Sequence, residues 1–251
     1  MPSNRSFREV IEIPDNIHEL SIKADLADLI FEPHDEDTLI LHGFILGGDP
    51  PKIDKTWNED NLDIMITRAR SESRIYSVKM KVFIPMNIIK KALNVSVDIG
   101  DIRVDGLPIN ILKIDVSNGD ILTGGVIADQ VKLSSQNGDV IFRGGNFKNG
   151  YFSTINGDIR LELLMEKNFY IYASCNKGRI RISMPIGVSA KIMSKALKGK
   201  VLITPKNYIR SYTKGEYEEI VFGNGDADIK LETLHGDINI NLFAELPMKP
   251  S

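Results

Sequence analysis

An internal repeat constrains the fold of this chain more than any other feature of its sequence. The segments DIGDIRV, SNGDILT, QNGDVIF, INGDIRL, NKGRIRI and LKGKVLI follow one another from residue 98. Their glycines are 19, 19, 19, 21 and 21 residues apart, and one more copy, LHGDINI, follows after 37 residues, close to two periods. A fixed period of this kind indicates one small structural unit that is repeated and stacked along an axis. The glycines are Gly100, Gly119, Gly138, Gly157, Gly178, Gly199 and Gly236.

Each copy combines a turn with the start of a strand. Asn-Gly and Asp-Gly pairs favour turns because both residues tolerate positive φ angles. Apolar residues such as Val140 and Ile141 follow the glycine, and short apolar runs bounded by Gly and Asn are typical of strands. The sequence therefore predicts a column of equivalent turns. The residues that we assign to these turns are Gly100, Asp101, Asn118, Gly119, Asp120, Asn137, Gly138, Asp139, Asn156, Gly157, Asp158, Gly236 and Asp237.

The length of the period selects the architecture. A propeller blade needs roughly 40 residues, which is about twice this repeat. A loop of about 19 residues at ~3.3 Å per residue holds two or three short strands. Such loops stack at ~4.8 Å, so that equivalent side chains form ladders along the axis. We therefore expect an all-β fold with a parallel β-solenoid over residues 93–245 and a short tail over residues 246–251.

Residues 1–92 lack the repeat. Apolar runs such as Leu39–Leu41 and Val78–Ile84 alternate there with polar loops such as EPHDED. We expect a β-rich N-terminal lead-in, which consists either of larger irregular coils or of a small sandwich, and which forms one continuous unit with the solenoid. In both cases it would act as a cap, because an uncovered strand edge invites aggregation.

Composition excludes several classes of protein. The chain has 251 residues, a formal net charge of −3 and 42% hydrophobic residues, which excludes a uniformly basic nucleic-acid binder. No apolar run reaches the roughly 18 to 20 residues that a membrane-spanning helix needs. The first residues lack the apolar core, roughly 7 to 15 residues long, of a secretory signal, which predicts a cytoplasmic location and leaves surface association open. The single cysteine, Cys175, excludes an internal disulfide.

The repeats and three further motifs resemble a known family. The motifs are the dipeptides Ile84-Pro85 and Met184-Pro185 and the ending FGNGDADIKLETLHGDINI. From Phe7 to Leu242 the chain is similar to the bacterial putative-adhesin family, whose members are β-helical and functionally uncharacterised. The resemblance implies a right-handed β-helix and implies no catalytic residues.

The aspartates of the turns should form one row along the stack, from Asp101 to Asp158. Stacked carboxylates could bind calcium, which prefers oxygen ligands. The alternative, which we favour, is that each aspartate accepts backbone N–H groups within its own turn. The next two copies carry Arg179 and Lys200 at this position, so we expect Asp158 and Arg179 to form an ion pair across one step of the ladder.

A second row consists of the asparagines that precede the turn glycines, from Asn118 to Asn156. Stacked asparagines can form a ladder in which each side-chain amide bonds to the next. We expect such a ladder here, with Asn176 as a candidate extension one residue further from its glycine. The row should serve structure and not ligand binding.

Charge is segregated along the chain although the net charge is small. Residues 176–214 contain ten Lys or Arg and no Asp or Glu, whereas residues 9–63 contain fifteen acidic and three basic residues, and residues 215–245 contain eight and one. The basic stretch either binds an anionic partner, such as an acidic polysaccharide, lipid head groups or a protein, with nucleic acid a less favoured choice, or is neutralised by the acidic last coil beside it. The candidate anion-binding residues are Lys177, Arg179, Arg181, Lys191, Lys195, Lys198, Lys200, Lys206 and Arg210.

Catalytic and metal-binding groups are sparse. The four histidines show no metal-ligand spacing, and the sequence contains no nucleophile-elbow, P-loop or paired-acid motif. Basic neighbours could lower the pKa of Cys175, but a lone cysteine beside a turn is more often a core residue. We therefore expect no catalytic residue, no metal site and no cofactor.

Aromatic residues gather in the second half of the chain. Exposed rings in a row would form a sugar-binding platform, whereas the alternation of strand side chains predicts that at least half point into the core. These residues are Phe147, Tyr151, Phe152, Phe169, Tyr170, Tyr172, Tyr208, Tyr212, Tyr217 and Phe222. The single tryptophan, Trp57, is predicted to lie in a loop.

These observations favour a non-enzymatic binding or scaffold protein that uses a long side of the solenoid. A carbohydrate-active enzyme of the β-helix kind is one alternative, and it would need paired carboxylates that protrude from adjacent coils. A structural protein that self-assembles through the solenoid ends is another. The sequence leaves the ligand and the oligomeric state open.

Overall fold

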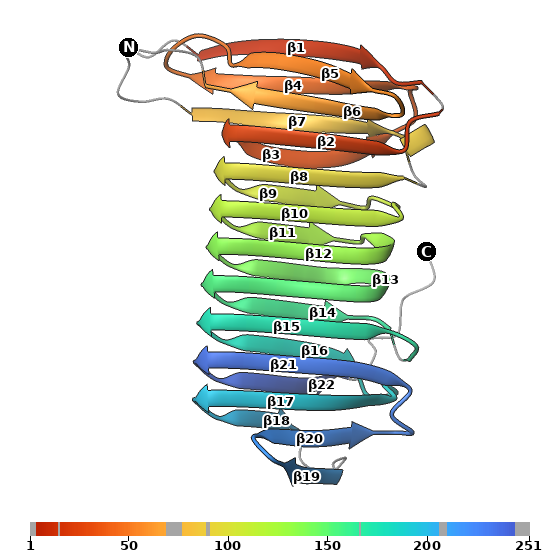
Figure 1. Ribbon diagram of the computed structural model, residues 1–251, viewed down its shortest axis with the longest axis vertical. Coiled ribbons are helices and arrows are strands. Elements are labelled where there is room, and N and C mark those ends of the chain that lie inside the picture. The colour runs from red at the N-terminus through yellow and green to blue at the C-terminus, as the bar shows by residue number, and fades with distance from the viewer. Residues whose placement is uncertain are drawn as a thin grey trace.

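The computed structural model describes residues 4–14, 16–68, 77–88, 91–165, 167–205 and 210–243. These residues form 22 strands and one short 3₁₀ helix, η1 (Met86–Ile88). Figure 1 shows the strands stacked along one axis in two layers, with the first strand of the chain at one end. The prediction of an all-β fold is confirmed.

The strands lie in two faces, which we name sheet A and sheet B. The strand β13 (Val140–Asn156) runs through both and joins them into one large sheet. In spatial order, sheet A contains β1 (Asn4–Glu12), β4 (Thr38–Leu46), β7 (Ser77–Pro85), β3 (Asp28–His34), β9 (Ile102–Asp105), β11 (Ile121–Gly124), β13, β14 (Ile159–Leu163), β16 (Ile180–Pro185), β22 (Ile238–Phe243) and β18 (Val201–Thr204). In the same direction, sheet B contains β5 (Lys52–Asn58), β6 (Asn61–Thr67), β2 (Glu19–Leu26), β8 (Ala92–Ile99), β10 (Ile111–Asn118), β12 (Ile127–Asn137), β13, β15 (Tyr170–Lys177), β21 (Ala227–His235), β17 (Ala190–Lys198), β20 (Tyr217–Phe222) and β19 (Arg210–Lys214).

Each central coil contains one long strand in sheet B and one shorter strand in sheet A, joined by a turn. Neighbouring coils pair in parallel with the register that the period predicts: Ile121 aligns with Val140, which aligns with Ile159. The step of 21 residues then aligns Ile159 with Ile180. The sequence repeat therefore corresponds to a stack of parallel coils.

The last copy of the repeat does not occupy the last place in the stack. Strands β21 and β22 lie between β15/β16 and β17/β18, with which they pair in parallel on both sides. After β18 the chain forms the antiparallel strands β19 and β20, and β20 pairs with β17. The chain then returns to fill the gap between two earlier coils. This explains why Gly236 follows Gly199 by 37 residues.

The N-terminal residues continue the same two faces. Strands β2 and β3 form a coil that pairs in parallel with β8 and β9. Beyond this coil, β4 pairs with β7 and with β1 in antiparallel fashion, and β5 pairs with β6 in the same way. Sheet A therefore begins with antiparallel strands, and sheet B has antiparallel strands at both ends.

The core fills the space between the two faces. Alternate residues of nearly every strand point inward, so Ile and Val form columns along the axis. The phenylalanines at one level, Phe142, Phe147 and Phe152, pack with ring centroids 5.1 to 5.8 Å apart. Burial of the large apolar side chains is the main favourable contribution to folding, at about 25 cal/mol for each Å² removed from water.

Close stacking at the turns requires glycine. Gly138 has a φ of +156°, and a Cβ atom there would lie 2.0 Å from the carbonyl oxygen of Gly119 in the preceding coil. The same approach recurs from one coil to the next. At these positions glycine therefore meets a steric requirement in addition to the conformational one.

The turn aspartates bond between coils and not within their own turns, so this part of the prediction was wrong. The Oδ1 atom of Asp101 accepts the backbone N–H of Asp120 at 2.8 Å, and Asp120 accepts that of Asp139 at 2.7 Å. The parallel register places each carboxylate beside the next N–H along the axis. The ladder begins at Asp28, which accepts the N–H of Asp101 at 3.1 Å.

The asparagine ladder is present. Asn137 donates to the side-chain oxygen of Asn118 at 3.0 Å, and Asn156 donates to that of Asn137 at 2.8 Å. Lys177, and not Asn176, aligns with Asn156 in the next coil. The extra residue before the glycine in this longer coil therefore shifts Asn176 out of the row.

Candidate anion-binding corner

The turns form one edge of the stack, which we name the turn corner. It lies where the strands of sheet B end and the chain crosses to sheet A, at the arrowheads of β15, β21 and β17 in Figure 1. In the earlier coils this corner carries the asparagine and aspartate ladders. In the later coils basic side chains take most of the same positions.

The register of the parallel strands shows which basic residues replace the asparagines and aspartates. Asn156 is followed along the axis by Lys177, His235 and Lys198. Two strand spacings separate Lys177 from Lys198, which is about 10 Å. Beside this row, the position of the aspartate ladder is occupied in turn by Arg179, Asp237 and Lys200. Arg181 aligns with Arg160, each at the second residue of its strand in sheet A.

The predicted ion pair between Asp158 and Arg179 is confirmed. The Nη2 atom of Arg179 lies 2.8 Å from Oδ2 of Asp158, whose Oδ1 accepts the backbone N–H of Arg179 at 2.9 Å. Arg160 also approaches Asp158, at 3.6 Å. Partial burial alone would raise the pKa of Asp158, but the hydrogen bonds and charge of Arg179, with help from Arg160, outweigh it and lower that pKa. The same pair raises the pKa of Arg179.

Other basic groups of the corner have no such partner. Within the described part of the chain, no carboxylate lies within ion-pair distance of four of these side chains, which are Lys177, Arg181, Lys198 and Lys200. Asp237 is the acidic residue nearest to Lys200 along the ladder, and its Oδ1 atom accepts the backbone N–H of Lys200 at 2.9 Å. The corner therefore carries an excess of positive charge over three adjacent coils.

The remaining predicted residues lie elsewhere. Lys191 and Lys195 project from the outer face of sheet B and approach Glu219, at 3.9 Å, and Glu216. Lys206 lies outside the described residues, and so does the side chain of Arg210, whose backbone belongs to β19. The structure thus brings five of the nine predicted residues together. Glu219 and Glu216 pair with Lys191 and Lys195 on the face of sheet B, and the corner remains positive.

Sequence reasoning did not include Arg160 and His235 in this cluster. Arg160 belongs to an earlier copy of the repeat, but parallel pairing places it beside Arg181. His235 comes from the copy that is inserted out of order, and it lies between Lys177 and Lys198. The period of the sequence could have located Arg160, whereas no sequence signal reveals the place of the inserted coil.

The aromatic residues divide by type between the two sides of the strands. The phenylalanines Phe147, Phe152, Phe169 and Phe222 are buried, which confirms the expected core packing for these residues. Four tyrosines are partly exposed on the outer face of sheet B, and these are Tyr151, Tyr170, Tyr172 and Tyr217. Tyr208 and the side chain of Tyr212 lie outside the described residues.

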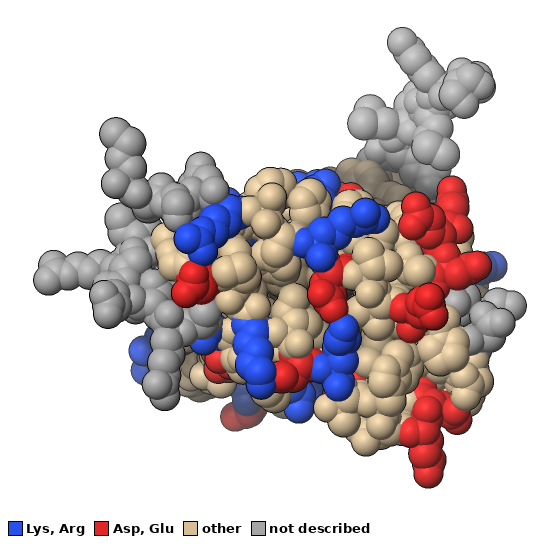
Figure 2. Space-filling model, turned by 90° about the horizontal axis from the view of Figure 1, so that it is seen from above, with Lys and Arg blue, Asp and Glu red and all other residues tan. Residues whose placement is uncertain are grey.

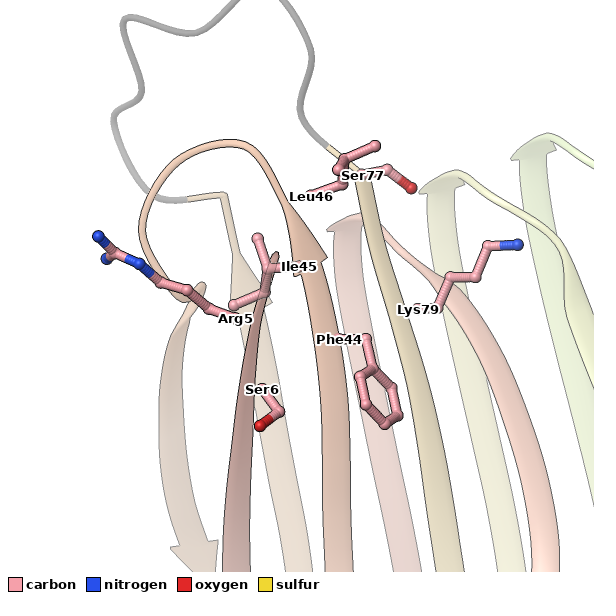
Figure 3. A pocket seen from close by; sticks show the side chains of 7 residues that line it. All are labelled: Arg5, Ser6, Phe44, Ile45, Leu46, Ser77 and Lys79. Atoms are coloured by element: carbon pink, nitrogen blue, oxygen red, sulfur yellow. The ribbon is translucent and has the colours of Figure 1, made fainter. Parts of the chain in front are cut away.

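Two other parts of the surface differ from the turn corner. Figure 2 looks onto the N-terminal end of the stack, where acidic side chains gather at one side and charges of both signs are interspersed elsewhere. An open groove of about 600 Å³ lies at the ends of β1, β4 and β7 (Figure 3). Arg5 in this groove is paired with Asp49 at 2.9 Å. Phe44 and Ile45 lie on opposite faces of β4, so the groove wraps around the ends of the strands. Its polar side chains do not form a cluster. Its lining residues are Arg5, Ser6, Phe44, Ile45, Leu46, Ser77 and Lys79.

Cys175 is a core residue, as expected. It is 5% exposed, and its thiol donates to the carbonyl oxygen of Gly157 with a separation of 3.3 Å. Burial raises the pKa of this thiol to about 11, so the suggestion that Lys177 and Arg179 activate it was wrong. Within the described residues, no group of three or more His, Cys, Asp or Glu side chains is arranged to hold a metal ion. No helix among those residues is both long enough and apolar enough to cross a membrane.

The geometry defines an all-β protein built from stacked, parallel, two-strand coils with a basic turn corner. The sequence profile of the family described as Toastrack DUF4097 matches residues 4–241, and the chain therefore belongs to this family. Among curated proteins, none matches the chain in sequence.

Several solved structures have a similar fold. A protein from Bacteroides fragilis, described as a putative adhesin, has a TM-score of 0.51 and 12% identity over 96% of this chain and 99% of its own. A putative cell adhesion protein from Clostridium sporogenes has a TM-score of 0.43 and 13% identity over 97% of this chain and 100% of its own. A putative lipid binding protein from Parabacteroides distasonis has a TM-score of 0.39 and 13% identity over 95% of this chain and 96% of its own. At these identities the likeness concerns the fold alone.

Proposed function

We propose that this protein is a non-enzymatic binding or scaffold protein that binds an acidic polysaccharide along its turn corner. The observation that supports the proposal is the row of basic side chains that replaces the asparagine and aspartate ladders over the last coils. Lys177 and Lys198 lie about 10 Å apart along the axis, so a chain of regularly spaced acidic groups would meet one after the other.

A linear polyanion suits this arrangement better than a small anion. The basic groups follow the axis of the stack and do not converge on one point. Exposed charges of this kind contribute weak individual attractions that salt screens, but several of them acting on one polymer chain add together. The partner should therefore bind with strong salt dependence.

The ladder aspartates give little support to the alternative of an enzyme. Adjacent coils do present carboxylates in a row, but Asp101, Asp120 and Asp139 each hold the backbone N–H of the next coil. The pKa of Asp158 is lowered, whereas a general acid that works near neutral pH needs a raised pKa.

We also infer that the coils follow the right-handed path that crossover connections between parallel strands strongly prefer.

The proposal can be tested with heparin and polygalacturonate as probes. A variant with Lys177→Gln, Lys198→Gln and Lys200→Gln should bind both probes about tenfold or more weakly at low ionic strength, because it loses three positive charges from one row. A matched variant with Lys23→Gln, Lys79→Gln and Lys113→Gln loses the same charge from exposed positions outside the corner. It should keep most of the affinity.

Two results would contradict the proposal. One is that the unaltered protein is not retained by either probe at low salt. The other is that the two triple variants lose affinity equally, which would reduce the effect to net charge. Vesicles with anionic head groups serve as a further arm, and binding to these vesicles in the absence of binding to either polysaccharide would replace the proposed partner by a lipid surface.

A further inference from the structure

The outer face of sheet B contains two adjoining hollows lined by tyrosines. The first measures about 440 Å³ and the second about 300 Å³. They meet at β15, which contributes Tyr172 to the first and Tyr170 to the second. The residues lining the first hollow include Gln130, Lys132, Tyr151, Ser153, Tyr172 and Ser174, and those lining the second include Tyr170, Lys191, Met193, Tyr217, Asp228 and Lys230.

The register of the strands places these side chains in rows along the axis. Lys132, Tyr151, Tyr172, Lys230 and Met193 occupy one row, in successive strands. The rings of Tyr151 and Tyr170 lie across neighbouring strands with centroids 5.7 Å apart. The two hollows together therefore form one elongated site that runs across the strands and parallel to the axis.

A partly buried hydrogen-bond network holds two of the tyrosines in place. The hydroxyl of Tyr172 donates to Oε2 of Glu232 at 2.7 Å, and the hydroxyl of Tyr217 donates to the other oxygen, Oε1. Nζ of Lys230 lies 3.0 Å from Oε1 of Glu232 and 5.4 Å from the centroids of both rings. Rings that are fixed before binding lose little conformational freedom when a ligand stacks on them.

The charges around the second hollow largely cancel. Lys191 and Lys230 are accompanied by Asp228, Glu219 and Glu232, so the hollow has no strong preference for either sign of charge. The first hollow adds one cation, Lys132, together with an amide and two serine hydroxyls, which can donate and accept hydrogen bonds. Partly exposed rings beside such groups suit a ligand with apolar faces and hydroxyl edges.

We infer that this tyrosine face binds a linear, neutral oligosaccharide that lies along the axis, with sugar rings stacked on Tyr151 and Tyr172 in the first hollow and on Tyr170 and Tyr217 in the second. Glu232 acts as a positioning residue that fixes Tyr172 and Tyr217. The site is separate from the turn corner and does not depend on it.

The test uses cellohexaose, xylohexaose, chitohexaose and laminarihexaose, with calorimetric titration of the complete chain. At least one of these probes should bind. Tyr151→Ala, and the double variant Tyr151→Ala with Tyr172→Ala, should lower its association constant by about tenfold or more. Tyr151→Phe keeps the ring and should keep the affinity. Glu232→Gln should weaken binding by a smaller factor, because the tyrosines remain but only one acceptor oxygen is left for their two hydroxyls.

Phe44→Ala is the matched control, since Phe44 is 56% exposed on sheet A, away from both hollows. This variant, and the triple glutamine variant of the corner, should bind the neutral probe as the unaltered protein does. The inference is overturned if no neutral hexasaccharide binds, or if Phe44→Ala lowers the affinity as much as Tyr151→Ala. Loss of affinity in the corner variant would overturn the separation of the two sites. Thermal unfolding of each variant shows that it is folded.

Discussion

At the scale of single residues, the turn glycines are packed from two directions. The carbonyl oxygen of Gly138 accepts the side-chain hydroxyl of Thr154 at 2.9 Å from the interior side. Along the axis, the Cα of Gly157 approaches the same carbonyl so closely that a Cβ atom there would be 2.0 Å from it. The same interior position in the next coil is filled by Cys175, which bonds to Gly157. These two turn carbonyls therefore require a small hydrogen-bond donor on the core side and a glycine at the same position of the next coil.

Replacing one turn glycine tests this requirement. We expect Gly138→Val to lower the free energy of unfolding by roughly 2–4 kcal/mol, because the new side chain meets backbone atoms of the neighbouring coil and also needs an unfavourable φ. Urea unfolding measures the change. Gly124→Ala is the control, since a Cβ there would have Oδ1 of Asp105 at 3.4 Å as its nearest neighbour. Equal stability of the two variants would refute the close approach of the coils.

At the scale of elements, the aspartate ladder links one coil to the next. Each carboxylate accepts an N–H of the following coil, and in the coil of Asp158 the ladder bond is combined with an ion pair to Arg179. The strength of this link depends on the charge of Asp158, whose side chain is 17% exposed. The link between these two coils should therefore respond to pH.

The pKa of Asp158 is lowered in the folded protein from its ordinary value of 3.8. A lowered pKa contributes stability that is fully present above 3.8 and is lost as the pH falls through the folded value. Asp158→Asn, which keeps the oxygen that accepts the N–H of Arg179, should be less stable than the unaltered protein by about 1 kcal/mol at neutral pH. This difference should shrink below pH 3.8.

Urea midpoints measured from neutral pH down to the acid limit of the folded state test this expectation. Asp120→Asn is the matched control, because Asp120 accepts the same kind of ladder bond and, in the described part of the chain, forms no ion pair with an arginine. A deficit of Asp158→Asn that stays constant with pH would show that its origin is not the charge of the carboxylate.

The coils themselves could be predicted from the sequence, but several of their neighbours could not. The regular spacing from Gly100 to Gly178 equals the number of residues between aligned positions of neighbouring parallel coils. The turns, the side-chain ladders and the ion pair of Asp158 with Arg179 could therefore be predicted from it. The insertion of β21 and β22 depends on which exposed edge a late segment meets, and no local pattern encodes this. The antiparallel strands at the ends lie outside the sequence repeat, so their pairing could not be predicted from the sequence either.

The candidate sites, too, could be predicted only in part from the sequence. The described basic side chains between positions 176 and 214 are divided between the outer face of sheet B and the turn corner, because alternate residues of a strand point in opposite directions and turns change the face. Lys195 and Lys198 therefore lie in different surroundings although three residues separate them. The exposure of tyrosines and burial of phenylalanines also required the register, since both types occur in the strands β13 and β20.

At the scale of the whole molecule, the two faces continue without a break from β1 to the last strands. The coil of β2 and β3 lies between β6 and β7 on one side and β8 and β9 on the other, so the region before residue 92 shares its pairing and its core with the repeats. Neighbouring coils stabilise each other only through such shared interfaces. A continuous core predicts that the N-terminal strands and the repeats unfold together.

The single tryptophan makes this last expectation measurable. Trp57 lies in β5 and not in the predicted loop, at the N-terminal end of sheet B, whereas far-ultraviolet circular dichroism reports on all strands. In urea, the tryptophan emission and the circular dichroism should change with one midpoint and one slope. Gly138→Val, whose site lies several coils away, should move both midpoints to lower urea by the same amount. A tryptophan midpoint that stays in place while the circular dichroism shifts would instead show that the N-terminal strands fold as a separate unit, because their stability would then be independent of the central coils.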